Sequence, residues 1–187
     1  GFFSFYVEPK ETKRFHVLAA AGRTSDEAKS LVSSFGSTTE DIEQLLREEL
    51  ERRKGLVAQF KERYVASEID DWMKWLIQAG DSFIVYRAST RRKSVIAGYH
   101  WFDDWGRDAL ISLPGLTLVT GRFEDAQEVL LTFERNCNNG VIPNRFSDKA
   151  GDIPLYNTVD ATLWFFNAVL HYLKYTGDYT FVKQNLW

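Results

Sequence analysis

Residues 158–179 carry the clearest structural signal: they read Thr158-Val-Asp-Ala-Thr-Leu-Trp-Phe-Phe-Asn-Ala-Val-Leu-His-Tyr-Leu-Lys-Tyr-Thr-Gly-Asp-Tyr179. Between Leu163 and Leu173, apolar residues cover nearly every face of a helix, which is typical of a helix in an inner layer. Gly177 suits the left-handed position that ends many helices. We therefore expect residues 158–175 to form an inner helix, with part of its apolar surface either open or covered by a partner chain when this chain stands alone.

A similar arrangement precedes this segment. Residues 105–119 have a helical pattern that ends in Thr120-Gly-Arg-Phe123, and the later helix ends in Thr176-Gly-Asp-Tyr179, with the two glycines 56 residues apart. Pro114 either kinks the first helix or marks a start at Leu113. Between the two helices, an amphipathic outer helix is predicted from apolar residues at helical spacing: Phe123, Ala126, Val129, Leu130 and Phe133.

A loop rich in Asn, Gly and Pro runs from 136 to 157 and completes the order inner helix, outer helix, long loop, inner helix. In this order, successive inner helices point the same way. Asp108 and Asp160 lie near the starts of the two inner helices, 52 residues apart. We therefore expect both carboxylates at one end of the assembly, together with the loops at 98–105 and 136–157.

The N-terminal part has a different pattern. Residues 1–22 alternate as two strands of a hairpin do, and because two strands alone are not stable, this predicts the end of a β domain that begins upstream. Thr24-x-x-Glu27 predicts a capped helix that Gly36 ends. The predicted domains are the tail of a β domain at 1–36, a connecting helix at 37–66, and the first part of a helical domain at 67–187.

Three further elements are expected before the middle of the chain. Thr38-x-x-Asp41 opens a highly charged, solvated helix. Ser67 is the predicted cap of a third helix, and residues 83–86 predict a short buried extended segment. The basic run at 87–93 lacks the glycines of a phosphate-binding loop, so we expect it to be solvated or salt-bridged.

Composition narrows the functional classes. The chain has 187 residues, 44% of them hydrophobic, and a net charge of −3, which argues against a nucleic-acid partner. No apolar run approaches the roughly 18 residues of a membrane span. The single cysteine, Cys137, suits a reducing cytoplasm and is expected to be a small buried thiol. Because Gly1 stands first and a helix breaks off at Trp187, we expect a fragment of a longer protein.

The residues from Gly98 to Asp108 concentrate groups that bind carbohydrate. They hold four aromatic rings, three carboxylates, His100 and Arg107. Aromatic faces cover the apolar side of a sugar ring, while carboxylate and guanidinium groups bind its hydroxyls. The alternative is a structural turn whose charges pair with one another. The three histidines have no metal-ligand spacing and no Gly-x-Ser-x-Gly is present, so neither a metal site nor a serine hydrolase is predicted.

Three blocks occur in order along the chain: Gly98-Tyr-His-Trp-Phe-x-Asp-Trp-Gly-Arg-Asp108, Ile142-Pro-Asn144, and Tyr156-Asn-Thr-x-Asp-Ala-Thr-Leu-Trp-Phe165. They resemble the amylo-α-1,6-glucosidase half of glycogen debranching enzymes of the bacterial and archaeal type. The resemblance covers residues 65–187 and extends to 1–35 as the tail of the preceding β domain. One departure is Ala109, where the family pattern has Thr or a similar residue.

This resemblance implies a mainly α fold: a fragment of an (α/α)6 barrel, or six-hairpin toroid, preceded by the end of a β domain. It implies glycogen debranching, with inverting hydrolysis of α-1,6-linked glucose at branch points of glycogen or limit dextrin. Inversion uses a general acid and a general base about 6.5–9.5 Å apart. The resemblance places both in later loops, so this fragment is expected to be inactive alone. It implies no cofactor, a cytoplasmic location, and as partners a branched α-glucan and the rest of the same polypeptide.

The resemblance also implies a pocket for the terminal glucose, formed by Trp101, Phe102, Asp104, Trp105, Arg107, Asp108, Asn144, Asn157 and Asp160. Arg107 and Asp108 would hold hydroxyls, and Asp108 and Asp160 are the catalytic candidates within this chain. Other roles stay open for three of these residues: Asp160 could stabilise a helix N-terminus, Asp108 could be a structural partner of Arg107, and Trp105 could belong to the core. Of the adjacent Asp103 and Asp104, the second is preferred.

Two other functions stay open at this point. One is another barrel glycosidase, similar to a glucoamylase or a trehalase. The other is a non-catalytic sugar-binding helical module. An assay that compares α-1,6, α-1,4 and α,α-1,1 linkages would separate the enzymes, and the presence or absence of catalytic carboxylates downstream would separate the module from both.

Overall fold

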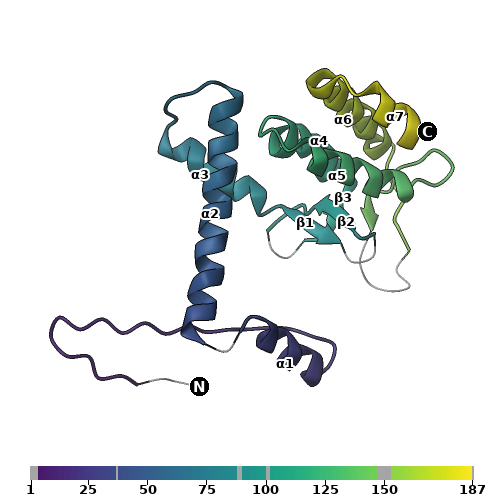
Figure 1. Cartoon of the computed structure of the whole chain (residues 1–187). Helices are drawn as coiled ribbons and strands as arrows, with labels where there is room; N and C mark the ends of the chain where they lie inside the picture. The colour runs from purple at the N-terminus through teal and green to yellow at the C-terminus, as the bar shows by residue number, and fades with distance from the viewer. Residues whose placement is uncertain (1–3, 37, 88–89, 100–101, 147–152, 187) are drawn as a thin grey trace. The chain divides into compact units, whose positions relative to one another are not determined.

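The computed structural model describes residues 4–36, 38–87, 90–99, 102–146 and 153–186, and is mainly helical (Figure 1). The chain divides into two compact units, Gly1–Lys54 and Gly55–Trp187. Its elements in order are α1 (Ser25–Ser34), α2 (Thr39–Arg63), α3 (Asp71–Asp81), β1 (Ile84–Arg87), β2 (Arg92–Val95), β3 (Asp104–Trp105), α4 (Gly106–Leu113), the π-helical turn η1 (Pro114–Leu118), α5 (Phe123–Arg135), β4 (Arg145–Phe146), α6 (Asp160–Thr176) and α7 (Tyr179–Asn185).

Residues 1–22 were predicted to form a hairpin. The chain makes a turn at the expected place, but it forms no paired strands between residues 4 and 22. The turn is closed by Glu11 N, which donates to Glu8 O at 2.9 Å. The rings of Phe5 and Phe15 stack with centroids 5.1 Å apart, yet both side chains are largely exposed. Two strands without a further sheet or helix to cover them gain little from pairing. The assignment of this segment to a larger β domain stays a prediction.

Both predicted capping sequences of this unit form. Glu27 N donates to Thr24 Oγ1 at 3.2 Å, while the Glu27 carboxylate accepts from Arg23 N at 2.7 Å. In the second box, Asp41 N donates to Thr38 Oγ1 at 3.1 Å and Thr38 N donates to Asp41 Oδ2 at 3.0 Å. These bonds satisfy backbone N–H groups that would otherwise lack partners in the first turns of α1 and α2.

The predicted glycine ends are also confirmed. Gly36, Gly121 and Gly177 adopt φ values of +90°, +79° and +67°, a region that other residues rarely enter. At the end of α6, Gly177 N donates to Leu173 O at 2.8 Å, as a left-handed cap requires.

In the C-terminal unit, α4, η1, α5 and α6 enclose the apolar core. The amphipathic helix predicted from its spacing is α5, and its predicted face is buried except for Phe123, which is half-buried, while its outer position in a barrel stays a prediction. The largest fully buried side chains of the core include Tyr172, Phe133, Leu110, Leu113, Leu118 and Leu130.

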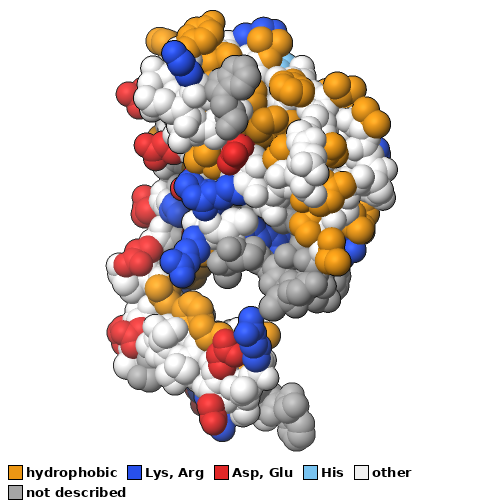
Figure 2. Space-filling view, turned by 90° about the vertical axis from the view of Figure 1, so that its right-hand side faces the viewer, with side chains coloured by type: hydrophobic (Ala, Val, Ile, Leu, Met, Phe, Trp, Pro, Cys, Tyr) orange, Lys and Arg blue, Asp and Glu red, His pale blue; other side chains and the backbone are white. Residues whose placement is uncertain are grey.

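The helix α6 has one buried and one open apolar stripe. The buried stripe follows helical spacing and consists of Ala161, Phe165, Ala168 and Tyr172. On the rest of the helix, Leu163, Phe166 and Leu170 are 62%, 66% and 49% exposed, and hydrophobic side chains gather on this side of the molecule in Figure 2. The prediction of an apolar helix with an open surface is confirmed, while its inner position in a complete barrel stays a prediction.

Pro114 does not start a helix. The chain stays helical through Leu113 and continues into η1, where Val119 N donates to Pro114 O at 2.9 Å, five residues back. Proline has no N–H and its ring displaces the carbonyl one turn earlier, so the helix widens locally into a π-turn. Of the two predicted alternatives, a start at Leu113 is therefore wrong, and a local distortion is correct.

Two other local predictions are wrong. The helix α3 begins at Asp71, with Asp70 as its N-cap, rather than directly after Ser67. Cys137 is exposed instead of buried. It lies just beyond the last turn of α5, where Cys137 N donates to Glu134 O at 2.8 Å, and no longer belongs to the buried face of that helix.

Two antiparallel strand pairs complete the unit: β1 with β2, and β3 with β4. The basic run at 87–93 is salt-bridged, as expected, because Arg87 pairs with Asp104 and Lys93 pairs with Asp125. Within the described ranges, no helix is both long and apolar enough to cross a membrane.

Candidate functional site

The first two sequence blocks meet at the start of α4. Gly106 N donates to Asn144 O at 2.8 Å. A Cβ at Gly106 would lie 2.5 Å from Pro143 O and 3.4 Å from the Cβ of Ala161. Glycine at this position therefore lets the 142–146 loop and the first turn of α6 approach the backbone of α4 closely.

The third block is joined to the same loop by hydrogen bonds. Asn144 N donates to Leu155 O at 2.7 Å, and Leu155 N donates to Arg145 O at 2.8 Å. Ile142 N donates to Thr162 Oγ1, in the first turns of α6, at 3.0 Å. Segments far apart in the sequence therefore converge around the starts of α4 and α6.

Arg107 and Asp160 form an ion pair between these two helix starts, through Nε and Oδ2. Their side chains are 50% and 37% exposed. The hydrogen bond from Arg107 lowers the pKa of Asp160 below its usual 3.8, and Asp160 in turn raises the pKa of Arg107. The helix starts lie side by side, as the predicted alternation of helices requires, and Asp160 is held ionised as a hydrogen-bond acceptor.

The other predicted site residues differ in exposure. Phe102 is 59% exposed, Asp108 and Asn157 are exposed, and Trp105 is half-buried. Trp101 lies outside the described residues. Asn144 is 6% exposed, and its Oδ1 has no hydrogen-bond partner in the described part of the chain. A buried amide oxygen of this kind is an acceptor that a ligand hydroxyl can satisfy.

Asp104 does not belong to the exposed group. Its side chain is fully buried and pairs with Arg87 at the end of β1. The neighbouring Asp103 is 37% exposed and pairs with Arg145, Nη2 to Oδ2, at 2.8 Å. Successive residues of a strand point to opposite faces, so the chain sends Asp104 inward and Asp103 outward. Of the two carboxylates, Asp103 is therefore the accessible one in this structure, and a binding role for Asp104 stays a prediction.

Arg145 is a polar group of this region that sequence reasoning missed. It follows Asn144 directly and lies opposite Trp105 in the β3–β4 pair. The signal that could have found it is the alternation of the short strand: with Asn144 facing inward, the next residue faces outward.

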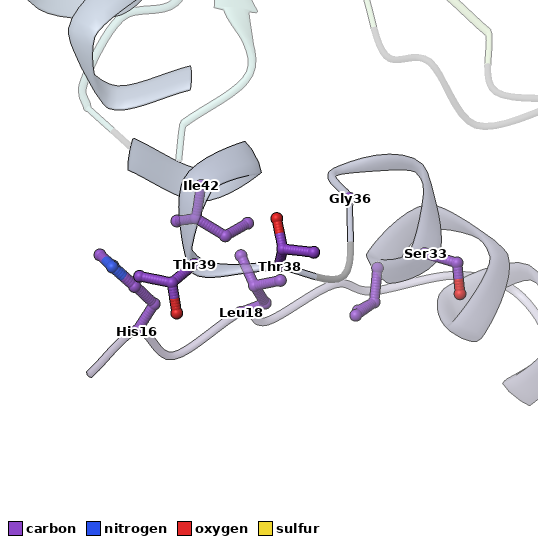
Figure 3. A pocket seen from close by; sticks show the side chains of 8 residues that line it. His16, Leu18, Ser33, Gly36, Thr38, Thr39 and Ile42 are labelled. Carbon is purple, nitrogen blue, oxygen red and sulfur yellow. The ribbon is translucent and has the colours of Figure 1, made fainter. Parts of the chain in front are cut away.

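Of the hollows in the described part of the chain, one lies beside these residues and another lies in the N-terminal unit. One of about 430 Å³ borders on Arg107 and Asp108, and its other lining side chains are mostly apolar: Leu76, Phe83, Val95, Ile96, Ile111 and Leu116. Its size is in the range of small-ligand pockets. The other, about 450 Å³ in the N-terminal unit, is lined by His16, Thr38, Thr39 and Ile42 among others and contains none of the predicted site residues (Figure 3). No group of three or more His, Cys, Asp or Glu in the described ranges is placed to hold a metal ion.

A family model described as amylo-alpha-1,6-glucosidase matches residues 78–187, more than half of the chain. The chain belongs to the amylo-alpha-1,6-glucosidase family. A segment of 74 residues is 43% identical to the glycogen debranching enzyme of Saccharomyces cerevisiae (strain ATCC 204508 / S288c). That segment covers 40% of this chain and 5% of the yeast protein, so the chain spans a small part of its relative's length. The family predicted from the three sequence blocks is confirmed, and the matched range contains every site residue predicted from the sequence, together with Asp103 and Arg145.

Proposed function

We propose that this chain supplies part of the terminal-glucose pocket of a glycoside hydrolase that removes α-1,6-linked glucose, with inversion, from branch points of glycogen or limit dextrin. The observation that carries the proposal is the Arg107–Asp160 ion pair, because it joins two family blocks at neighbouring helix starts and leaves both groups accessible. The enzyme acts in the cytoplasm without a cofactor, and the rest of its polypeptide completes an (α/α)6 barrel in which α4 and α6 are inner helices and α5 is an outer one.

In this pocket, each group has a separate task. The carboxylate of Asp160 accepts from sugar hydroxyls, and the remaining N–H groups of Arg107 donate to hydroxyl oxygens. Asp108, which follows Arg107 on α4, adds a second carboxylate. Phe102 and Trp105 cover the apolar face of the ring, with Trp101 beside them in sequence. Asn157 and the amide oxygen of Asn144 supply further polar contacts.

The general acid and general base lie outside these residues. Each such group contributes about 10²–10⁴-fold to the rate, so a chain that lacks both retains little activity. The 187-residue chain should release no glucose from limit dextrin above background. Substantial release by the purified chain would contradict the proposal and make Asp108 the first candidate for the acid.

Asp108→Asn in the intact enzyme separates binding from acid catalysis. The variant keeps the side-chain shape but loses a charged acceptor, so kcat/KM on a branched substrate should fall about 10- to 150-fold. The same loss is expected on α-glucosyl fluoride, whose leaving group needs no protonation. Recovery to near-wild-type rates on the fluoride would instead identify Asp108 as the general acid.

Linkage specificity tests the substrate. Glucose release is expected from α-1,6-linked branch stubs in preference to α-1,4 and α,α-1,1 linkages. A preference for either of the latter would indicate another barrel glycosidase. Binding of branched glucan without release from any of the three linkages would indicate a non-catalytic module.

A further inference from the structure

We propose that Asp103 and Arg145 bind a second glucosyl ring of the branched glucan, next to the ring held by Arg107 and Asp160, with Trp105 lying between the two rings and contacting both. This inference rests on the function proposed above. It assigns a binding role to an ion pair that the three sequence blocks did not identify.

The three groups share one face of the strand pair. Trp105 lies directly opposite Arg145 in the β3–β4 register, and residues opposite each other in an antiparallel pair project to the same side. Asp103 precedes Trp105 by two positions and therefore lies on that side as well. The pairing of Arg145 with Asp103 is consistent with this placement. Leu155 forms an antiparallel bridge with Arg145 on the side away from Trp105. Its side chain is 42% exposed and adds an apolar group to this face.

This face is continuous with the proposed glucose pocket. Only Gly106 separates Trp105 from Arg107, so the Cα atoms of these two residues lie within about 7.6 Å of each other. Gly106 is also bonded to the loop that carries Arg145, through Asn144 O at 2.8 Å. When the terminal ring of a glucan lies at Arg107, the next glucosyl ring therefore lies near Trp105 and Arg145.

The chemistry of the pair suits a sugar better than a purely structural role. Nη2 and Nε of Arg145 both donate to the same oxygen, Asp103 Oδ2, at 2.8 and 3.3 Å. Asp103 Oδ1 has no hydrogen bond in the described part of the chain, so a donor and an acceptor stand side by side for neighbouring hydroxyls. Ion pairs as exposed as this one stabilise proteins little. Asn144 and Arg145 are already held by backbone bonds, from Gly106 N to Asn144 O and from Leu155 N to Arg145 O.

Two substrates of the intact enzyme test this assignment. α-Glucosyl fluoride carries one ring, whereas a maltooligosaccharide with an α-1,6-linked glucose stub carries several. In Asp103→Asn and Arg145→Gln, the ratio of kcat/KM on the branched substrate to kcat/KM on the fluoride should fall about 10- to 150-fold, mainly through a higher KM. Asp160→Asn should lower both values and leave their ratio close to that of the wild type. As a matched control, Asp71→Asn breaks another exposed pair, with Lys74 on α3, and should change neither value.

The outcomes distinguish this inference from the proposed function. If the wild-type enzyme releases glucose from neither substrate, the proposed function fails. If the wild type is active but Asp103→Asn and Arg145→Gln lower kcat/KM equally on the two substrates, the pair is structural and this inference is wrong. It is equally wrong if the ratio stays unchanged in both variants while each folds as the wild type does by circular dichroism and thermal unfolding.

Discussion

Asp103 and Asp104 are adjacent residues of the same type, and their ion pairs lie on opposite faces of the chain at β3. The pair Asp104–Arg87 is buried, with side-chain exposures of 0% and 11%, whereas Asp103–Arg145 is exposed to 37% and 38%. A buried charge that loses its partner is strongly destabilising, whereas an exposed pair contributes little because water solvates both ions. The comparison shows how one step along a strand separates a buried, charge-paired carboxylate from one that solvent reaches, and the second is the one proposed to bind a ligand.

The largest effect is expected at the buried pair. Asp104→Asn keeps the side-chain volume but removes the fully buried negative charge that pairs with Arg87, so the free energy of unfolding should fall by about 3–5 kcal/mol. Chemical denaturation followed by circular dichroism measures this loss.

A double variant sharpens the same point. Arg87→Met combined with Asp104→Leu removes both charges, so it should be clearly more stable than Asp104→Asn alone. If the double variant were the less stable of the two, the buried pair would stabilise the fold through its attraction and not only through the cost of breaking it.

A smaller loss in the free energy of unfolding is expected from Gly106→Ala. Gly106 lies where the backbone of α4 meets the loop at 142–146. The added Cβ would lie 2.5 Å from Pro143 O, so backbone must move, at a cost of about 1–3 kcal/mol. Gly115→Ala, where a Cβ meets nothing within 4 Å, is the matched control and should be neutral or stabilising. Thermal unfolding of the two variants measures the difference, and equal stabilities would show that the loop shifts freely.

Asp103→Asn should change the free energy of unfolding by at most about 1 kcal/mol, because its pair is exposed. The same denaturation experiment as for Asp104→Asn gives the comparison directly. Similar losses in the two variants would mean that exposure does not separate the roles of the two carboxylates.

The smallest effect is a shift in titration at the other exposed pair. Arg107 lowers the pKa of Asp160, so Asp160 should titrate below 3.8 in the folded protein. A carboxyl group with a lowered pKa stabilises the fold above the pKa of its unfolded state, and that contribution disappears as the pH falls through the folded pKa. Carbon-13 NMR of the Asp160 carboxyl measures the midpoint, and in Arg107→Gln it should rise toward 3.8. An unchanged midpoint would mean that the pair does not persist in solution.

Much of the helical structure was predictable because its causes are local. The capping boxes at Thr24 and Thr38, the buried stripe of α5, and the glycine ends at Gly121 and Gly177 each depend on residues within one or two turns of one another. Propensity, spacing and capping act over the same short range, so they agree with the structure. The family blocks were recognisable for a related reason, because each is a contiguous run of residues.

Errors occurred where a local signal competed with packing. The start of α3 lies at Asp71 although Ser67 is an acceptable cap, and the segment 4–22 alternates without forming paired strands. At Pro114 two alternatives were predicted, and of these the local distortion, a π-turn, is correct and the new helix start is wrong. In each case, the sequence allowed more than one local solution.

The polar contacts of the candidate site depend on residues distant in sequence. Arg107 lies 53 residues from Asp160, Asp103 lies 42 from Arg145, and Arg87 lies 17 from Asp104. The sequence alone specified helices, their ends, the family and a region rich in sugar-binding groups, because short-range rules and contiguous motifs encode these. Which carboxylate is buried, and which arginine each one meets, was settled by the approach of β1, α4, α6 and the 142–146 loop, since exposure and pairing are properties of segments that meet in space.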